Sequence, residues 1–209
     1  MTYVENVYIC LAAPILLAIL YLQKSSRRSL VFLLCGMTSC LFSAYVSTYL
    51  AEMAGVGAET AAHQISPAVE EIIKILPLLF YILVLKPEKI NVYAGTFMVS
   101  VGFATFENVC FLLSHGSEDL QHLLVRGFGT GAMHVVCGMI VASGLYILWD
   151  KVWLRIAGVF AFLSFAVTLH AVYNIFVSHS GVIFWIGSAV PLVIILIYLV
   201  FLRNLNLDV

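Results

Sequence analysis

Long apolar stretches separated by short polar loops follow one another along the whole chain. They lie at about 7–22, 30–50, 67–85, 92–113, 125–149, 157–177 and 184–202. Each approaches the length that an α-helix needs to cross about 30 Å of hydrocarbon. The pattern predicts an all-α polytopic membrane protein, a helical bundle of about seven transmembrane helices.

The composition supports a chain that is embedded in the bilayer almost throughout. Hydrophobic residues make up 63% of the 209 residues, charged residues 10%, and the mean hydropathy is +1.07. No repeat or soluble segment interrupts the pattern, so residues 1–209 are expected to form a single transmembrane domain. The net charge of -1 gives no indication of nucleic-acid binding. The five cysteines lie in apolar stretches, and we interpret them as small buried hydrophobic residues.

The basic residues outside the stretches occupy alternate loops. They are Lys24, Arg27, Arg28, Lys86, Lys89, Lys151, Arg155 and Arg203. The other loops carry acidic and histidine residues but no Lys or Arg. The positive-inside rule therefore places the N-terminus outside and the C-terminus in the cytoplasm. Because the positive charges follow the first stretch, we expect it to be a retained anchor and not a cleaved signal peptide.

A small set of polar residues lies inside the predicted helices. Inserting one ionisable side chain near the bilayer centre costs about 2.5–3.5 kcal/mol, and such residues usually mark a functional site. At a rise of 1.5 Å per residue, these side chains come from four predicted helices at a similar depth, in the outer leaflet. They are Glu70, Glu71, Lys74, Glu107, Arg126, His134 and His170, with the amides Asn108 and Asn174. The set predicts one hydrated pocket near the outer face.

Helical spacing indicates how two of these segments are arranged. Gly127, Gly131, His134 and Gly138 share one helix face, which predicts a close helix contact with His134 pointing toward it. Ser66 is expected to cap the helix that carries the paired glutamates.

Most of these ionisable residues, but not Glu107, also have a structural interpretation. Glu70 and Glu71 near a helix N-terminus favour the helix dipole, with Lys74 as an i+3 or i+4 partner. Arg126 can extend to the membrane boundary, and a single buried histidine is often only structural. Glu107 has no basic residue within one turn. The combination on four helices therefore favours a site.

Four short motifs resemble those of the PrsW family of intramembrane proteases. They are "EEIIK" at 70–74, "GFATFEN" at 102–108, "HVVCG" at 134–138 and "HAVYN" at 170–174. Their order on successive predicted helices makes the set specific, and it covers a core of about 67–177. The family belongs to a wider group with type II CAAX prenyl endopeptidases and the gamma-secretase scaffold subunit.

The resemblance implies an intramembrane endopeptidase of a bacterial cell membrane, embedded in the lipid bilayer, that cleaves single-pass membrane proteins. Relatives are described as cleaving membrane-anchored anti-sigma factors from the outer side. Two functions from other classes stay open: a proton- or cation-coupled transporter, and a non-catalytic membrane scaffold.

Two mechanisms are consistent with the residues. In a metal-free, glutamic-type mechanism, a carboxylate of Glu70 or Glu71 activates water, helped by Glu107 or His134. His170 and Asn174 then stabilise the oxyanion, and Lys74, Asn108, Gly138 and Arg126 support the site. In a zinc mechanism, His134, His170 and Glu107 or one of the paired glutamates bind Zn²⁺.

We favour the metal-free mechanism, with no cofactor, because no H-E-x-x-H helix fixes two histidines one turn apart. Adjacent helical residues point about 100° apart, so one glutamate is expected to face water and the other to pair with Lys74. The sequence does not distinguish the two.

Overall fold

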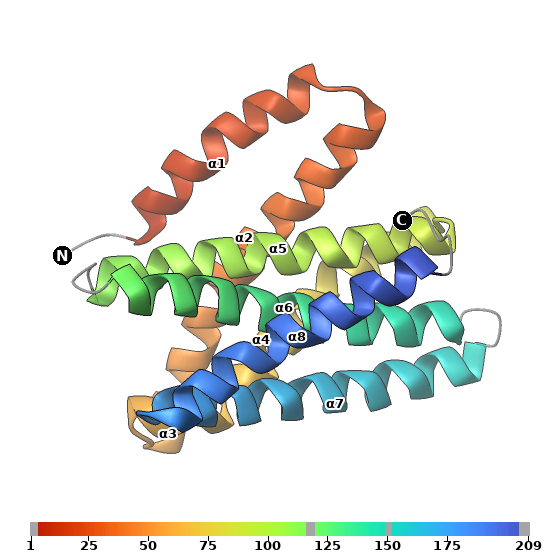
Figure 1. Ribbon diagram of the computed structural model, residues 1–209. Coiled ribbons are helices and arrows are strands. Elements are labelled where there is room, and N and C mark those ends of the chain that lie inside the picture. Colours follow the sequence, from red (N-terminus) through yellow and green to blue (C-terminus); the bar gives the residue numbers. More distant parts are fainter. Residues whose placement is uncertain (1–3, 116–119, 149–151, 205–209) are drawn as a thin grey trace.

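The computed structural model is entirely helical over the residues that it describes, which are 4–115, 120–148 and 152–204 (Figure 1). The elements are α1 (Val4–Tyr21), α2 (Lys24–Ala54), α3 (Ala58–Gln64), α4 (Ser66–Phe80), the π-helical segment η1 (Tyr81–Leu85), α5 (Lys89–His115), α6 (Leu120–Ile147), α7 (Val152–Ser178) and α8 (Val182–Asn204). The predicted all-α class is confirmed.

Five helices are long and apolar enough to cross a membrane: Val4–Tyr21, Lys24–Ala54, Ile90–Ser114, Leu123–Leu145 and Val152–Ser178. Val182–Tyr198 is a shorter apolar helix. These helices confirm the prediction of a multi-pass membrane protein. The α4–η1 segment carries Glu70, Glu71 and Lys74, and it is predicted from the sequence to cross the membrane. This crossing, the total of seven transmembrane helices and the orientation of the termini all stay predictions.

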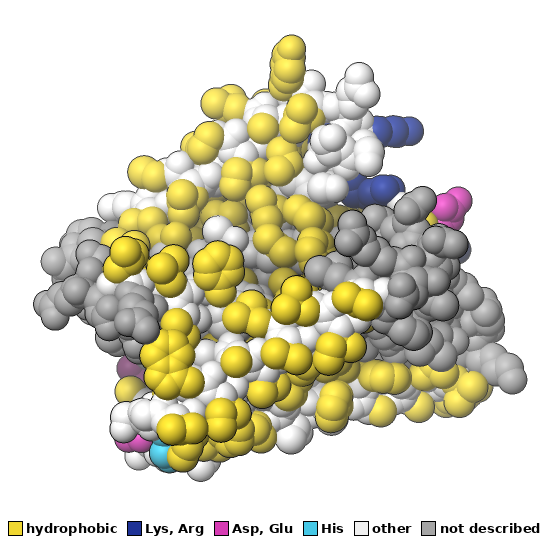
Figure 2. Space-filling model, viewed as in Figure 1, with side chains coloured by type: hydrophobic (Ala, Val, Ile, Leu, Met, Phe, Trp, Pro, Cys, Tyr) yellow, Lys and Arg dark blue, Asp and Glu magenta, His cyan; other side chains and the backbone are white. Residues whose placement is uncertain are grey.

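Polarity is distributed as expected for a protein surrounded by lipid. Large apolar side chains cover much of the surface in Figure 2, and Leu20 and Trp153 are 82% and 85% exposed. In contrast, Lys74 is only 4% exposed and His134 is 0% exposed. The charges inside the bundle must therefore find partners within the protein.

The polar segment at 51–66, expected to be a loop, is largely helical. Helix α2 ends at Ala54, and Gly55 adopts a left-handed conformation with φ 66°, which suits glycine at a helix C-terminus. The short helix α3 then leads into α4, with Ile65 between them in a right-handed helical conformation. Ser66 was wrongly predicted to be a cap. It is the first residue of α4, and no side-chain cap bond forms, because the chain is already helical before it.

Glycines set the contact between α2 and α5. A Cβ added at Gly36 would collide with the backbone of Val99 and Phe103, and one added at Gly102 would collide with the backbone of Leu33. The two helices therefore touch backbone to backbone. This contact fixes the fully buried ring of Phe103, which lies 4.8 Å from the His134 ring between centroids.

Helix α6 packs against α5, α7 and α8 (Figure 1). The predicted glycine face is only partly used. Gly138 packs closely against Ser100 of α5, but an added Cβ at Gly127 or Gly131 would meet nothing within 4 Å. The prediction of close packing at Gly127 and Gly131 was wrong, because no neighbouring element approaches the Cβ positions at that end of the face.

All five cysteines are free. Cys40 and Cys137 are buried, as predicted, but Cys10 is exposed. It lies on α1, of which Ala12 is the only described residue that is buried.

Candidate active site

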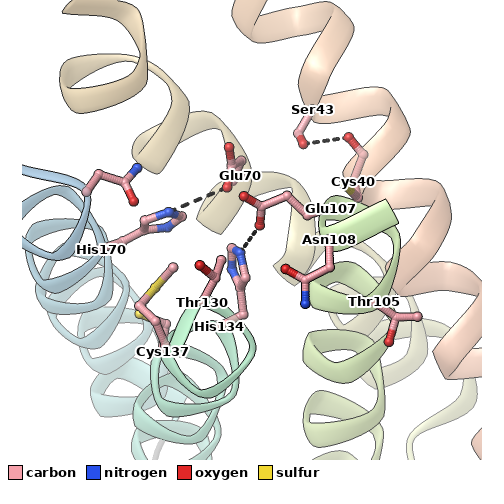
Figure 3. A network of polar contacts seen from close by, with 12 residues as sticks. Cys40, Ser43, Glu70, Thr105, Glu107, Asn108, Thr130, His134, Cys137 and His170 are labelled. Carbon is pink, nitrogen blue, oxygen red and sulfur yellow. Dashed lines mark hydrogen bonds and ion pairs between the residues drawn. The ribbon is translucent and has the colours of Figure 1, made fainter. Parts of the chain in front are cut away.

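The predicted polar residues come together where four helices meet. Figure 3 shows Glu70 of α4, Glu107 of α5, His134 of α6 and His170 of α7 converging, with the imidazoles directed toward the carboxylates. Glu71 and Lys74 lie next to them on α4. These side chains, distant in sequence, therefore share one contact network.

Glu71 and Lys74 form the buried part of this network. The Lys74 ammonium donates to Glu71 Oε1 at 2.6 Å and lies 3.1 Å from His134 Nδ1. His170 Nδ1 lies 2.8 Å from the same Glu71 oxygen. Glu71 is 3% exposed. Glu71 is therefore the glutamate that pairs with Lys74.

These contacts fix the protons of both imidazoles. An ammonium only donates, so His134 Nδ1 accepts from Lys74, and Nε2–H donates to Glu107 Oε2. His170 Nδ1–H donates to the Glu71 carboxylate, which leaves Nε2 of the neutral ring as an acceptor facing Glu70. The predicted role of His170 as an oxyanion donor stays a prediction.

Glu70 faces a cavity. Its Oε2 atom lies 3.6 Å from His170 Nε2, is inaccessible to solvent, and has no hydrogen-bond partner in the described part of the chain. The cavity has a volume of about 300 Å³, and Glu107, Arg126 and Asn174 also line it. Glu70 is therefore the member of the glutamate pair that borders open space.

Arg126 belongs to the cavity wall. Its guanidinium lies 3.5 Å from Glu107 Oε1, donates to Thr130 Oγ1 at 3.0 Å, and stacks 3.6 Å from the centre of the Phe111 ring. Thr130 lies 3.0 Å from the Tyr173 hydroxyl. Sequence reasoning missed Thr130 and Tyr173. The available signals were the i, i+4 spacing from Arg126 and the position next to Asn174.

The two amides connect helices. Asn108 Nδ2 donates to the Gly127 carbonyl at 3.2 Å, which ties α5 to α6. Asn174 Nδ2 donates to the Ala62 carbonyl at 2.9 Å, which ties α7 to α3. Asn174 lines the cavity. Gly138 lies farther along α6, against α5. Asn108 and Gly138 therefore position the helices that carry Glu107 and His134.

A zinc ion fits part of this arrangement. Donor atoms of Glu70, His134 and His170 lie within 4.8 Å of one another, and one carboxylate with two imidazoles is a common zinc ligand set. The grouping contains Glu70, not Glu71 or Glu107. His170 has the arrangement usual for a metal ligand, because its other nitrogen donates to a carboxylate.

His134 fits zinc less well than the other two residues. Its Nδ1 faces the Lys74 ammonium, and its Nε2 proton is directed at Glu107. Binding through Nε2 would require loss of that proton and of the bond to Glu107. The donor types and spacing therefore fit, but one ligand would have to change its protonation.

Among the described residues, the charges at the site do not balance. Glu70, Glu71 and Glu107 face two permanent cations, Lys74 and Arg126. Three negative charges against two positive ones leave one negative charge in surroundings where charge is expensive. An additional proton or a bound cation would compensate it.

Comparison with known families decides the family of the chain. A family model described as PrsW family intramembrane metalloprotease matches residues 25–202. The chain belongs to this family. The match extends well beyond the four motifs, and it supports an intramembrane endopeptidase with membrane proteins as substrates.

The PrsW family is described as a metalloprotease family, which gives no support to the preference for a metal-free mechanism. The transporter and scaffold alternatives also receive no support from the match. Searches of curated proteins and of solved structures found no significant match.

Proposed function

We propose that this PrsW family member hydrolyses a peptide bond of a single-pass, membrane-anchored protein near the outer face of a bacterial cell membrane. An anti-sigma factor is the substrate class that the family resemblance implies. The observation that carries the proposal is the position of the Glu70 carboxylate, which borders a polar cavity. One of its oxygens, Oε2, is buried and accepts no hydrogen bond from the described residues.

Glu70 acts as the general base. It takes a proton from a water molecule in the cavity while the water oxygen attacks the carbonyl carbon of the scissile bond. The protonated carboxyl group then gives this proton to the leaving amine as the carbon–nitrogen bond breaks. His170 Nε2, at 3.6 Å from Glu70 Oε2, accepts a hydrogen bond from the protonated form.

Two other groups on the cavity wall stabilise the oxyanion. Asn174 uses one amide hydrogen on Ala62 and has a second to donate. Arg126 brings a positive charge, and its Nε–H has no acceptor in the described residues. Such donors, fixed before the reaction, are the main source of oxyanion stabilisation. Glu107 holds Arg126 and His134 in place through its two carboxylate oxygens.

Zinc, when held by Glu70, His134 and His170, would supply a Lewis acid that polarises the carbonyl and makes water easier to deprotonate. With Glu70 as a ligand, Glu107 would be the remaining carboxylate on the cavity wall, among the described residues, in a position to accept a proton. Glu71 keeps its role in both cases, because it holds His170 Nδ1–H and Lys74.

The test uses purified protein, a single-pass reporter substrate and measurement of metal content. The parent should cleave the reporter, and Glu70→Gln should lower the rate by about 10²- to 10⁴-fold. Thermal unfolding of each variant controls for folding. Equal cleavage by the parent and by folded Glu70→Gln and His170→Ala proteins would refute the proposal.

Metal content separates the two mechanisms. Full activity after complete zinc removal would exclude the zinc mechanism. Loss of activity on chelation, restored by one zinc per chain, would exclude the metal-free one.

A further inference from the structure

A second concave surface lies at the opposite end of α4 from the Glu70 cavity. Its volume is about 740 Å³, and it is formed by the first turns of α2 and the end of α4 with η1. Its lining includes the basic residues Lys24, Arg27 and Arg28 and the apolar residues Val31, Phe80 and Leu85. We call this surface the basic groove.

One end of the basic groove is strongly positive. Lys24, Arg27 and Arg28 line it, and among the described residues no carboxylate lines it or forms an ion pair with the three cations. The dark-blue side chains in Figure 2 lie near the turn between α1 and α2. Helix α2 also begins here without a side-chain cap, so its dipole adds positive potential.

The remainder of the basic groove is apolar. Val31 belongs to α2, and Phe80 and Leu85, which are 63% and 62% exposed, belong to α4 and η1. Phe32 and Tyr81 meet edge to face with ring centroids 5.0 Å apart and hold the two walls together. A site for a free anion needs no such apolar extension, but an anionic lipid does.

We propose that the basic groove binds one anionic phospholipid. Its phosphate lies among Lys24, Arg27 and Arg28, and an acyl chain follows Val31, Phe80 and Leu85. The three cations lie at the end of α2 that the positive-inside rule assigns to the cytoplasm. Basic pockets between transmembrane helices on that side bind anionic headgroups. This inference does not depend on the protease function.

Native mass spectrometry of the full chain in detergent tests the proposal, with phosphatidylglycerol and phosphatidylcholine as probes. Phosphatidylglycerol should bind the parent at least about tenfold more tightly than phosphatidylcholine. The double variant Arg27→Gln/Arg28→Gln should lose this preference. Lys86→Gln is the matched control, since Lys86 lies beyond η1 and does not line the groove. It should keep the preference.

Two outcomes would overturn the proposal. Equal binding of the two lipids to the parent, or an unchanged preference in a folded double variant, would show that the groove holds only general boundary lipid. Displacement of phosphatidylglycerol by glycerol phosphate at similar concentration would show a site for a free phosphate. The arginines are not buried, so the double variant should unfold at the parent's temperature.

Discussion

Glu70 and Glu71 are neighbours in the chain but have different surroundings. Side chains of adjacent helical residues point about 100° apart. Glu71 therefore points into the bundle, toward Lys74 and His170, whereas Glu70 borders the cavity. Replacing each glutamate should have a different effect.

Glu70→Gln should abolish most of the activity and leave stability nearly unchanged, since the Glu70 carboxylate accepts no hydrogen bond at Oε2. Glu71→Gln should instead lower the free energy of unfolding by about 3–5 kcal/mol, because the Lys74 ammonium stays buried without a counter-charge. Reporter cleavage and thermal unfolding in detergent measure the two effects. A stable Glu71→Gln protein and an unstable Glu70→Gln protein would contradict the assignment.

Lys74 and Glu71 should also be strongly coupled. Lys74→Met alone should cost about 3–5 kcal/mol, because the Glu71 carboxylate then lacks its ammonium partner. The double variant Lys74→Met/Glu71→Gln should cost less than the sum of the single changes by at least about 1 kcal/mol. A double-mutant cycle, with unfolding measured for each variant, gives this interaction free energy between Lys74 and Glu71. Strict additivity would show that the pair does not stabilise the fold.

At the scale of elements, the α2–α5 contact constrains the geometry of the site. Gly36 of α2 and Gly102 of α5 allow the two backbones to touch. Helix α5 carries both Phe103 and Glu107, so this contact sets where Glu107 meets His134. A side chain at either glycine would have to move α5 as a whole.

Gly102→Ala should therefore destabilise the protein by about 1–3 kcal/mol. Its Cβ would lie 2.8 Å from the Leu33 carbonyl carbon, which is backbone and does not yield easily. Gly131→Ala is the matched control within a helix. Its Cβ meets nothing within 4 Å, and alanine is the better helix former, by up to about 1 kcal/mol. Equal unfolding temperatures for the two variants would show that α2 and α5 do not pack backbone to backbone at Gly102.

At the scale of the whole molecule, the two concave surfaces lie at opposite ends of α4. Ser66 and Glu70 line the cavity, and Pro77 and Phe80 line the basic groove. With the predicted orientation, the cavity opens toward the outside and the groove toward the cytoplasm. The two openings lie on opposite sides of the membrane only if the α4–η1 segment crosses the bilayer.

Cysteine labelling in intact cells tests this crossing. In a chain whose native cysteines are replaced by serine, Glu59→Cys in α3 should react with a membrane-impermeant maleimide from outside. Lys86→Cys, beyond η1, should react only after the membrane is permeabilised. Reversed reactivity would invert the orientation, and equal reactivity from outside would exclude a crossing by α4–η1.

Several features of this protein follow from the sequence alone. The lengths of the apolar stretches determined the helical, membrane-embedded fold, because bilayer thickness fixes the length of a crossing helix. The polar residues of the site were also recognisable, because a charge inside such a helix is costly wherever it lies. Both arguments need only the identity and order of the residues, not their neighbours in space.

The tertiary structure decided the rest. It separated Glu70 from Glu71, grouped Glu70 with the two histidines at a spacing that suits a metal ion, and added Thr130 and Tyr173 to the site. Each of these depends on how far a helix is rotated about its own axis. Contacts between helices distant in sequence set that rotation, and a change of one residue corresponds to about 100°. The chemical partners of each side chain are therefore fixed only when the helices pack.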